Sequence, residues 1–123
     1  MKQTLPLSAI HINDSYWNRY TRLIPDKVIP YQWEILNDRI PGVPPSNCLK
    51  NFRIAAGEEK GERQGTVFQD SDAAKWLEAV AYSLACRPDP ALEETADEVI
   101  ALIGRAQGNL HSAQAEKCGL YNR

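Results

Sequence analysis

Residues 67–106 contain two apolar stripes with helical spacing, and the short break between the stripes constrains the fold most. The first stripe recurs at steps of three and four through Ala73, Trp76, Leu77, Val80, Ala81 and Leu84. The second repeats that spacing through Leu92, Ala96, Val99, Ile100, Ile103 and Ala106. Arg87-Pro88 ends the first helix and Asp89-Pro90 starts the second, as N-cap and first-turn proline. So short a connection predicts an antiparallel αα-hairpin.

A polar turn, Gln69-Asp70-Ser71-Asp72, precedes the first of these helices. Short side-chain oxygens accept hydrogen bonds from free N–H groups at a helix start, and negative charge suits that end of the helix dipole. Two neighbouring carboxylates could also form an acid–base pair with separated pKa values. Because aspartate is so common as a cap, we predict that this turn caps the helix.

The N-terminal part predicts a helix interrupted by prolines. Residues 1–13 alternate loosely and predict an extended lead-in, at most one strand. Asn13-Asp14-Ser15 supplies a helix start, and helical spacing follows from Trp17 to Ile35. Pro25 and Pro30 fall inside this spacing, and each removes a helical N–H group. We therefore expect two shorter helices or one kinked helix.

The middle of the chain and its end have no long periodic segment. Residues 38–51 hold three prolines and one glycine and predict a loop, followed by a short segment at 51–57 in which Phe52 and Ile54 are packed. After residue 107 the periodicity is lost. We predict one helical unit at 1–107 and an appended tail at 108–123.

Composition narrows the class of protein. A chain of 123 residues is one domain or less, and a formal net charge of −2 gives no reason to expect nucleic acid as a partner. No apolar run is long enough to span a membrane, and the N-terminus lacks the pattern of a signal peptide, so we expect a cytoplasmic protein. Cys48, Cys86 and Cys118 are widely spaced, which favours free thiols over disulfides or a zinc site.

The sequence supplies no complete catalytic set. Cys48 has no histidine base near it in sequence, since His11 and His111 lie toward opposite ends of the chain. Trp17, Trp33 and Trp76 could stack on a sugar, but aromatic residues on an apolar helical stripe are more often core. We therefore predict no catalytic residue and no metal ligand in this chain.

Three segments nevertheless resemble the N-terminal region of glycoside hydrolase family 127, whose characterised activity is β-L-arabinofuranosidase. They are VIPYQWEILND at 28–38, NFRIAAG at 51–57 and GTVFQDSDAAKWLEAVAYSLACRPDPALEETADEVIALIGRAQ at 65–107. The resemblance covers residues 7–107 and implies an all-α fold of antiparallel helix pairs, here part of an incomplete (α/α)6 barrel. It also implies that Gln69, Asp70, Ser71 and Asp72 lie near the sugar, at the rim or wall of that barrel.

The family's mechanism, as the resemblance implies it, is that of a retaining glycosidase. Its nucleophile is a cysteine thiolate held by zinc, with a glutamate and further cysteines as ligands. Those motifs come later in the barrel, and Cys48, Cys86 and Cys118 match none of them. Zinc is thus expected in the full-length family and not in this chain.

The resemblance stops where the predicted tail begins. After Ala106-Gln107 the family typically continues with a DGYLNTYF-like segment, whereas this chain continues GNLHS. We expect a truncated or frameshifted family member that is itself inactive, its full-length parent acting on an arabinose-containing glycan. A partial barrel leaves apolar helix faces uncovered, which predicts marginal stability or self-association. The alternative is a small helical interaction module that binds a partner through an exposed apolar face.

Overall fold

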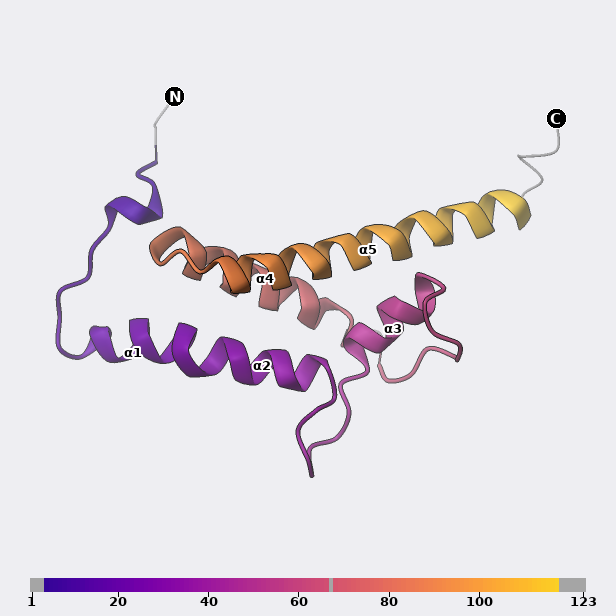
Figure 1. Cartoon of the computed structure of the whole chain (residues 1–123), viewed down its shortest axis with the longest axis horizontal. Helices are drawn as coiled ribbons and strands as arrows, with labels where there is room; N and C mark the ends of the chain where they lie inside the picture. The colour runs from indigo at the N-terminus through magenta and orange to yellow at the C-terminus, as the bar shows by residue number, and fades with distance from the viewer. Residues whose placement is uncertain (1–3, 67, 118–123) are drawn as a thin grey trace.

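The computed structural model describes residues 4–66 and 68–117, with side-chain surroundings up to Leu110, and every regular element in that part is helical. In chain order the elements are η1 (Leu7–Ala9), α1 (Trp17–Leu23), η2 (Ile24–Val28), α2 (Ile29–Leu36), α3 (Cys48–Ala55), α4 (Ser71–Cys86) and α5 (Pro90–Lys117). Figure 1 shows α1 and α2 in one line along one side of the molecule, with α4 and α5 along the other. The all-α prediction is confirmed for the described residues.

The α4–α5 hairpin forms where the sequence places it. Arg87 leaves the helical region at φ −143° and ψ 97°, which ends α4. Asp89 Oδ1 then accepts hydrogen bonds from the N–H groups of Ala91 and Leu92, both at 3.2 Å, and so caps α5. The two helices run in opposite directions (Figure 1), which confirms the predicted antiparallel pair.

Helix α5 is longer than its apolar stripe predicts, because it continues past residue 107 to Lys117. Gly104 and Gly108 lie inside it. Once a helix is nucleated each further residue adds one hydrogen bond, so a polar segment without proline extends it readily. Asn109 Nδ2 also donates to the Ala55 carbonyl at 2.9 Å, which ties this part of α5 to α3.

The first helical segment consists of two shorter α-helices joined by a π-helical turn at Pro25, which is one of the two forms predicted. Asp14 Oδ1 accepts from the N–H groups of Tyr16 and Trp17, both at 2.9 Å, and this confirms the predicted helix start. Between α1 and α2 lies the π-helical turn η2, in which the Ile29 N–H donates to the Ile24 carbonyl. A wider turn of this kind accommodates backbone groups that proline leaves without their usual partners.

The lead-in contains no strand within residues 4–13, contrary to one of the two forms predicted for it. It has a single 3-10 turn, η1, in which the Ala9 N–H donates to the Pro6 carbonyl at 3.0 Å. A strand needs a neighbour to receive its backbone hydrogen bonds, and the described part of the chain supplies none. Helix α4 contacts η1 instead.

The loop predicted at 38–51 is shorter than expected, since α3 begins at Cys48. Its prolines all precede Ser46, so nothing later in the segment prevents a helix. Asp38 closes the loop, its Oδ1 accepting from the N–H groups of Ser46 at 2.6 Å and Asn47 at 3.0 Å. The carboxylate thereby occupies the start of α3, where negative charge is favourable.

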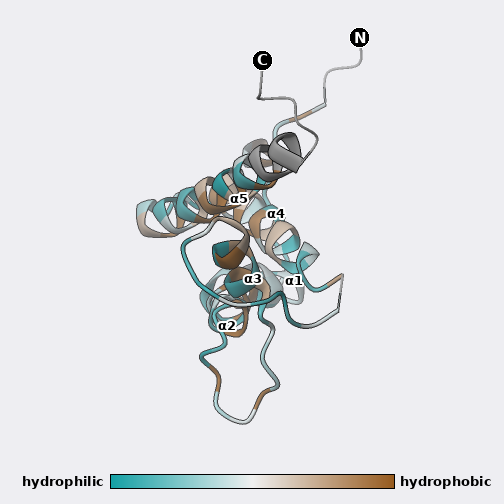
Figure 2. Cartoon of the chain, turned by 90° about the vertical axis from the view of Figure 1, so that its right-hand side faces the viewer, coloured by the Kyte–Doolittle hydropathy of each residue, from teal (hydrophilic) through white to brown (hydrophobic). Residues whose placement is uncertain are grey.

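The core lies where α2, α3, α4 and α5 meet, and hydrophobic colouring falls mainly on these helices (Figure 2). Its buried members are Ile29, Leu36, Cys48, Leu49, Ala73, Trp76, Val80, Ala96, Val99 and Leu102. Trp76 is 4% exposed, donates from Nε1 to the Ile29 carbonyl at 3.1 Å, and stacks on Trp33 with ring centroids 4.8 Å apart. The core interpretation is thus confirmed for Trp76 and for half-buried Trp33 and Phe52, whereas Trp17 is 57% exposed.

Candidate functional site

The polar turn before α4 does not cap that helix, which corrects the prediction. Asp70 stands at the N-cap position but has helical dihedral angles, φ −64° and ψ −24°, and makes no side-chain cap hydrogen bond. A capping side chain needs an extended backbone to fold back over the first turn. Gln69 Oε1 instead accepts from the Thr66 N–H at 2.7 Å, and Ser71 Oγ donates to the Phe68 carbonyl at 2.7 Å.

Asp70 is the centre of a network that joins α3, the loop after it and α4. Its Oδ2 accepts from Arg63 Nη2 at 2.7 Å and Nε at 3.0 Å, and its Oδ1 accepts from Asn51 Nδ2 at 2.9 Å. Asn51 is buried, and its amide also pairs with both the N–H and the carbonyl of Gln64, at 3.1 and 2.9 Å. Arg63 donates further to the carbonyls of Gly65 and Thr66. The network fixes the path of the loop.

A cleft of about 330 Å³ adjoins this network. Its lining residues are Asn51, Phe52, Ile54, Ala55, Arg63, Asp70 and Leu110. Polar groups along one edge of an apolar hollow are the usual composition of a site for a small polar ligand. Of the four residues predicted to lie near a sugar, Asp70 lines this cleft, and Gln69, Ser71 and Asp72 are not among the lining residues.

The two carboxylates of the turn do not form an acid–base pair. Asp70 is bound by Arg63 and Asn51, whereas Asp72 Oδ1 pairs with Lys75 Nζ at 2.8 Å. Each carboxylate therefore has its own cationic partner. The geometry supports an ordering role for Asp70.

The Cys48 thiol is buried in the core and donates to the Asp70 carbonyl with Sγ and O 3.6 Å apart. Burial raises the pKa of this thiol to about 11; the negative charges of Asp70, Asp72 and Asp38 raise it too, against a hydrogen bond from the Ala73 backbone that lowers it. Since the thiolate is the nucleophilic form, a buried thiol with a raised pKa is a poor nucleophile.

The described residues do not fit the zinc site that the family implies. In residues 4–66 and 68–110, no three His, Cys, Asp or Glu side chains gather closely enough to hold a metal ion. Cys86 is an exposed free thiol on α4, and His11 is exposed on the lead-in. Cys118 and the side chain of His111 lie outside the described residues. No catalytic step through zinc follows from this part of the chain.

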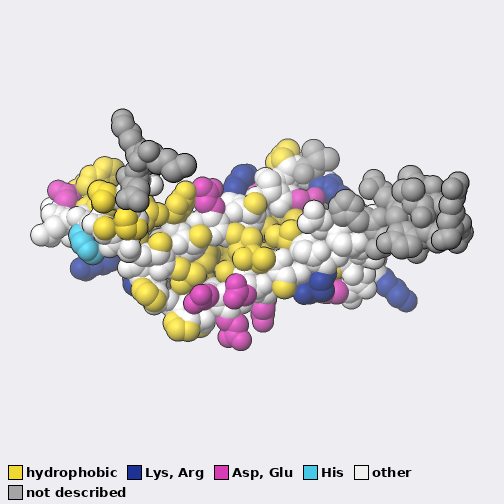
Figure 3. All heavy atoms as spheres, turned by 90° about the horizontal axis from the view of Figure 1, so that it is seen from above, with side chains coloured by type: hydrophobic (Ala, Val, Ile, Leu, Met, Phe, Trp, Pro, Cys, Tyr) yellow, Lys and Arg dark blue, Asp and Glu magenta, His cyan; other side chains and the backbone are white. Residues whose placement is uncertain are grey.

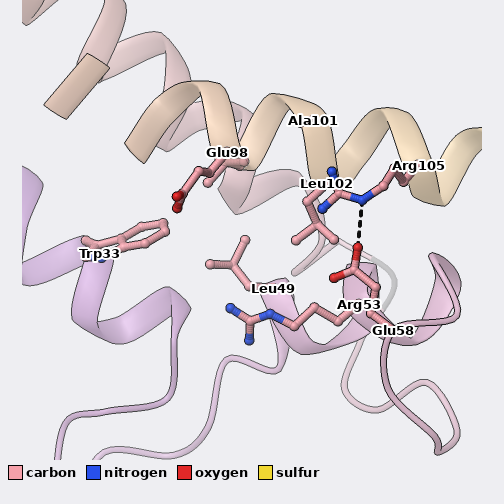
Figure 4. A pocket seen from close by; sticks show the side chains of 9 residues that line it. Trp33, Leu49, Arg53, Glu58, Glu98, Ala101, Leu102 and Arg105 are labelled. Carbon is pink, nitrogen blue, oxygen red and sulfur yellow. Dashed lines mark hydrogen bonds and ion pairs between the residues drawn. The ribbon is translucent and has the colours of Figure 1, made fainter. Parts of the chain in front are cut away.

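A second cleft, of about 350 Å³, lies between α2, α3 and α5 (Figure 4). Figure 4 shows Glu98 and the Arg53 guanidinium on opposite sides of it, and an ion pair of 2.6 Å joins Glu58 to Arg105 at its end. The Trp33 ring is stacked on Trp76 and lies 6.0 Å from the Arg39 guanidinium, which leaves little of it to stack on a sugar. Sequence spacing carried no signal for this cleft, because its charged residues come from elements distant in the chain.

Comparison with solved structures defines the class of protein. The chain is similar to the crystal structure of a GH127 β-L-arabinofuranosidase from Geobacillus stearothermophilus T6, with 60% identity and a TM-score of 0.76. That likeness covers 78% of this chain and 15% of the solved chain. It confirms that the helix pairs belong to the α/α-barrel class of fold.

Comparison with family models gives the particular family. The model described as β-L-arabinofuranosidase, GH127 catalytic domain, matches residues 9–121. The chain therefore belongs to glycoside hydrolase family 127, which confirms the resemblance predicted from its motifs. Both α5 and this match continue past residue 107, and the division of the chain at that position remains a prediction.

A curated relative points the same way. The chain is 39% identical to the non-reducing end β-L-arabinofuranosidase of Bifidobacterium longum subsp. longum over an alignment 127 residues long, which covers 91% of this chain. It spans 19% of that relative's length, as it spans 15% of the solved structure's. The described residues also include no helix both long and apolar enough to cross a membrane.

Proposed function

We propose that this chain supplies part of a glycoside hydrolase family 127 catalytic domain whose complete form hydrolyses β-L-arabinofuranosides or related glycans. The observation that carries the proposal is the family match over residues 9–121. Both relatives described above are named as β-L-arabinofuranosidases. The domain is an (α/α)6 barrel, of which this chain is an incomplete part, and the protein is cytoplasmic.

The chain alone is inactive in this proposal. Two observations support that: the Cys48 thiol is held protonated by burial, and the described residues bring together no metal-binding group. The nucleophile and the zinc of the complete domain come from other residues. The contribution of this chain is the scaffold that shapes one wall of the substrate site.

Within that wall, the turn Gln69–Asp72 lies on the sugar side. Asp70 is the strongest of its four members, because it lines the cleft of about 330 Å³ and orders the loop through Arg63 and Asn51. The other three shape the turn through short-range bonds of their own. The arabinose-containing substrate meets an edge whose geometry Asp70 sets.

A hydrolysis assay on an aryl β-L-arabinofuranoside tests the proposal. We expect no hydrolysis by the chain alone, and hydrolysis by a chimera in which residues 9–107 replace the matching part of the G. stearothermophilus enzyme. The intact enzyme serves as the positive control. A chimera that folds and binds zinc but hydrolyses nothing contradicts the proposed function, and hydrolysis by the chain alone contradicts its inactivity.

A second candidate is a small helical interaction module, and the exposed apolar residues favour it. Large hydrophobic side chains such as Trp17, Tyr82 and Ile100 are each more than half exposed. A stable complex with a protein unrelated to the family, formed in preference to a family 127 remainder, would favour this candidate. Self-association through the same surfaces follows from the first candidate, because a partial barrel leaves apolar helix faces uncovered.

A further inference from the structure

The cleft of about 350 Å³ between α2, α3 and α5 carries opposite charges on its two sides. Figure 4 shows the Glu98 carboxylate on the α5 side and the Arg53 guanidinium on the α3 side. The residues described around it all differ from those around the cleft of about 330 Å³ beside Asp70. It is therefore a separate place on the molecule, and the wall proposed for the sugar does not account for it.

The Arg53 guanidinium is held in place chiefly by a neutral partner. Its Nη2 donates to Asn37 Oδ1 at 3.3 Å, and the Asn37 amide is oriented in turn by donating from Nδ2 to the Trp33 carbonyl at 2.9 Å. The carboxylate that pairs with Arg53 in the described part of the chain belongs to Glu59 and lies 3.9 Å away, at the long end of an ion pair. Arg53 thus presents an oriented guanidinium that can still take a carboxylate.

The Glu98 carboxylate lacks a cation. It is exposed, and no side chain described in residues 4–66 and 68–110 forms a hydrogen bond or an ion pair with it. Glu94, one turn earlier, carries the same charge, and like charges at this spacing destabilise a helix. Figure 3, seen from the α5 side, shows acidic side chains gathered along one edge of the surface. A cationic group bound at Glu98 relieves this repulsion.

Apolar side chains form the floor of the cleft between the two charges. Leu49 of α3 and Val99 and Leu102 of α5 line it and are 1%, 2% and 6% exposed. The Trp33 ring lines it too, but Trp76 and the Arg39 guanidinium leave little of that ring free. A neutral sugar would find little aromatic surface here and would leave both charges uncompensated. A ligand with an apolar body and a charge at each end fits the cleft better.

We propose that this cleft binds a short zwitterionic chain, a dipeptide with an apolar side chain, with its ammonium at Glu98 and its carboxylate at Arg53. A single α-amino acid carries both charges on one carbon, whereas two residues of extended chain separate its ends by about 7 Å. The separated charges suit a cleft whose own charges lie on opposite sides. A guanidinium binds a carboxylate through two parallel hydrogen bonds, and the apolar side chain packs on Leu49 and Val99. The inference goes beyond the proposed function, because binding here requires no hydrolysis.

Calorimetric titration of the full 123-residue chain with L-alanyl-L-leucine tests the assignment. Affinity should fall about tenfold for N-acetyl-L-alanyl-L-leucine, which lacks the ammonium, and for L-alanyl-L-leucinamide, which lacks the carboxylate, because each loses one charge-assisted contact. Free L-leucine, whose charges cannot reach both sides, should bind about tenfold more weakly as well.

Two variants assign the ends of the ligand. Glu98→Gln should weaken binding of the free dipeptide about tenfold and leave that of the acetylated dipeptide unchanged, because the latter has no ammonium to pair. Arg53→Gln should likewise weaken binding of the free dipeptide and not of the amide. Glu94→Gln, on the same helix but outside the lining of the cleft, is the matched control and should leave all affinities unchanged.

Several outcomes overturn the assignment. They are equal affinity for the free and blocked dipeptides, an equal effect of Glu98→Gln on the free and acetylated forms, and absence of binding at about 10 mM dipeptide. Tighter binding of L-arabinose than of the dipeptide overturns it too and assigns the cleft to a sugar. Circular dichroism of each variant, expected to match the wild type in helical content, separates lost binding from lost folding. None of these results bears on hydrolysis, so the proposed function is tested separately.

Discussion

At the residue scale, Asp70 shows that a good helix-capping residue can serve another purpose. Its carboxylate is bound by Arg63 and Asn51, so the helix start is held by tertiary contacts rather than by a local cap. Neither Arg63 nor Asn51 could be assigned as a partner of Asp70 from the sequence. Each lies in a different segment, and its distance along the chain from Asp70 does not indicate a contact. The identity of the turn was predictable, and its contacts were not.

We expect Asp70→Asn to destabilise the protein by about 1 kcal/mol, a modest value because the ion pair with Arg63 is partly exposed to solvent and screened. Freed from the carboxylate, Arg63 should become the first site of tryptic cleavage. Urea unfolding and timed proteolysis measure the two effects. Asp72→Asn, which removes the more exposed pair with Lys75, is the control and should change neither. Unaltered cleavage at Arg63 in Asp70→Asn would show that the network does not order the loop.

The Cys48 thiol should make stability depend on alkaline pH. Its pKa rises from 9.0 to about 11 on folding, chiefly through burial, so the folded state binds this proton more tightly than the unfolded state. Its contribution to the free energy of unfolding is complete below pH 9 and is lost as pH rises from 9 to about 11. Urea unfolding of the wild type and Cys48→Ala across that range isolates the effect, because other groups titrate equally in both. Parallel curves for the two proteins would contradict the prediction.

At the element scale, the two helices that carry an apolar stripe and are separated by a short proline-containing connection were predicted correctly. Helix boundaries that depend on contacts with the rest of the fold were not. The pair α4–α5 follows directly from its spacing and from Asp89-Pro90. Helix α3 begins inside the segment predicted as a loop, where no helix was predicted, and α5 continues past the end of its apolar stripe. The loop before α3 ends after its last proline, where the Asp38 carboxylate accepts hydrogen bonds from the backbone. The spacing of residues in the sequence does not reveal such a contact.

The contact between α2 and α4 includes one buried hydrogen bond, from the indole N–H of Trp76 to the Ile29 carbonyl. We expect Trp76→Phe to keep an aromatic ring beside Trp33 but to cost about 2 kcal/mol, since that carbonyl loses its side-chain donor and the smaller ring leaves a gap. Trp17→Phe alters an exposed ring and should stay within about 0.5 kcal/mol of the wild type. Chemical unfolding curves of the two variants and the wild type measure these differences in the free energy of unfolding. Equal stability of the two variants would contradict a structural role for the hydrogen bond.

At the scale of the whole molecule, large hydrophobic side chains stay exposed on several elements of the chain. Exposed hydrophobic residues occur on the lead-in, α1, α4 and α5, among them Ile10, Trp17, Tyr82 and Ile100. The resemblance to a family of longer proteins predicts this exposure. The small share of each relative's length that the chain spans agrees with that prediction. Which residues of the apolar stripes stay exposed could not be predicted, because exposed Ala81 and Ile100 belong to the same stripes as the core.

We expect the chain alone to unfold over a broad temperature range, to bind a dye specific for apolar surface, and to associate as its concentration rises. Calorimetry, dye fluorescence and sedimentation velocity measure these properties. The intact G. stearothermophilus enzyme is the matched control and should bind little dye when folded. A sharp cooperative transition in a chain that stays monomeric at high concentration would contradict the prediction.

The Asn51–Arg63–Asp70 network also bears on the order in which the chain folds during synthesis. Its side-chain hydrogen bonds join residues only 7 to 19 positions apart, so closing them costs little chain entropy. All three residues leave the ribosome before α5 does. The loop and the start of α4 can therefore become ordered while the C-terminal helix is still inside the exit tunnel, and α5 then docks on a surface that is already in place.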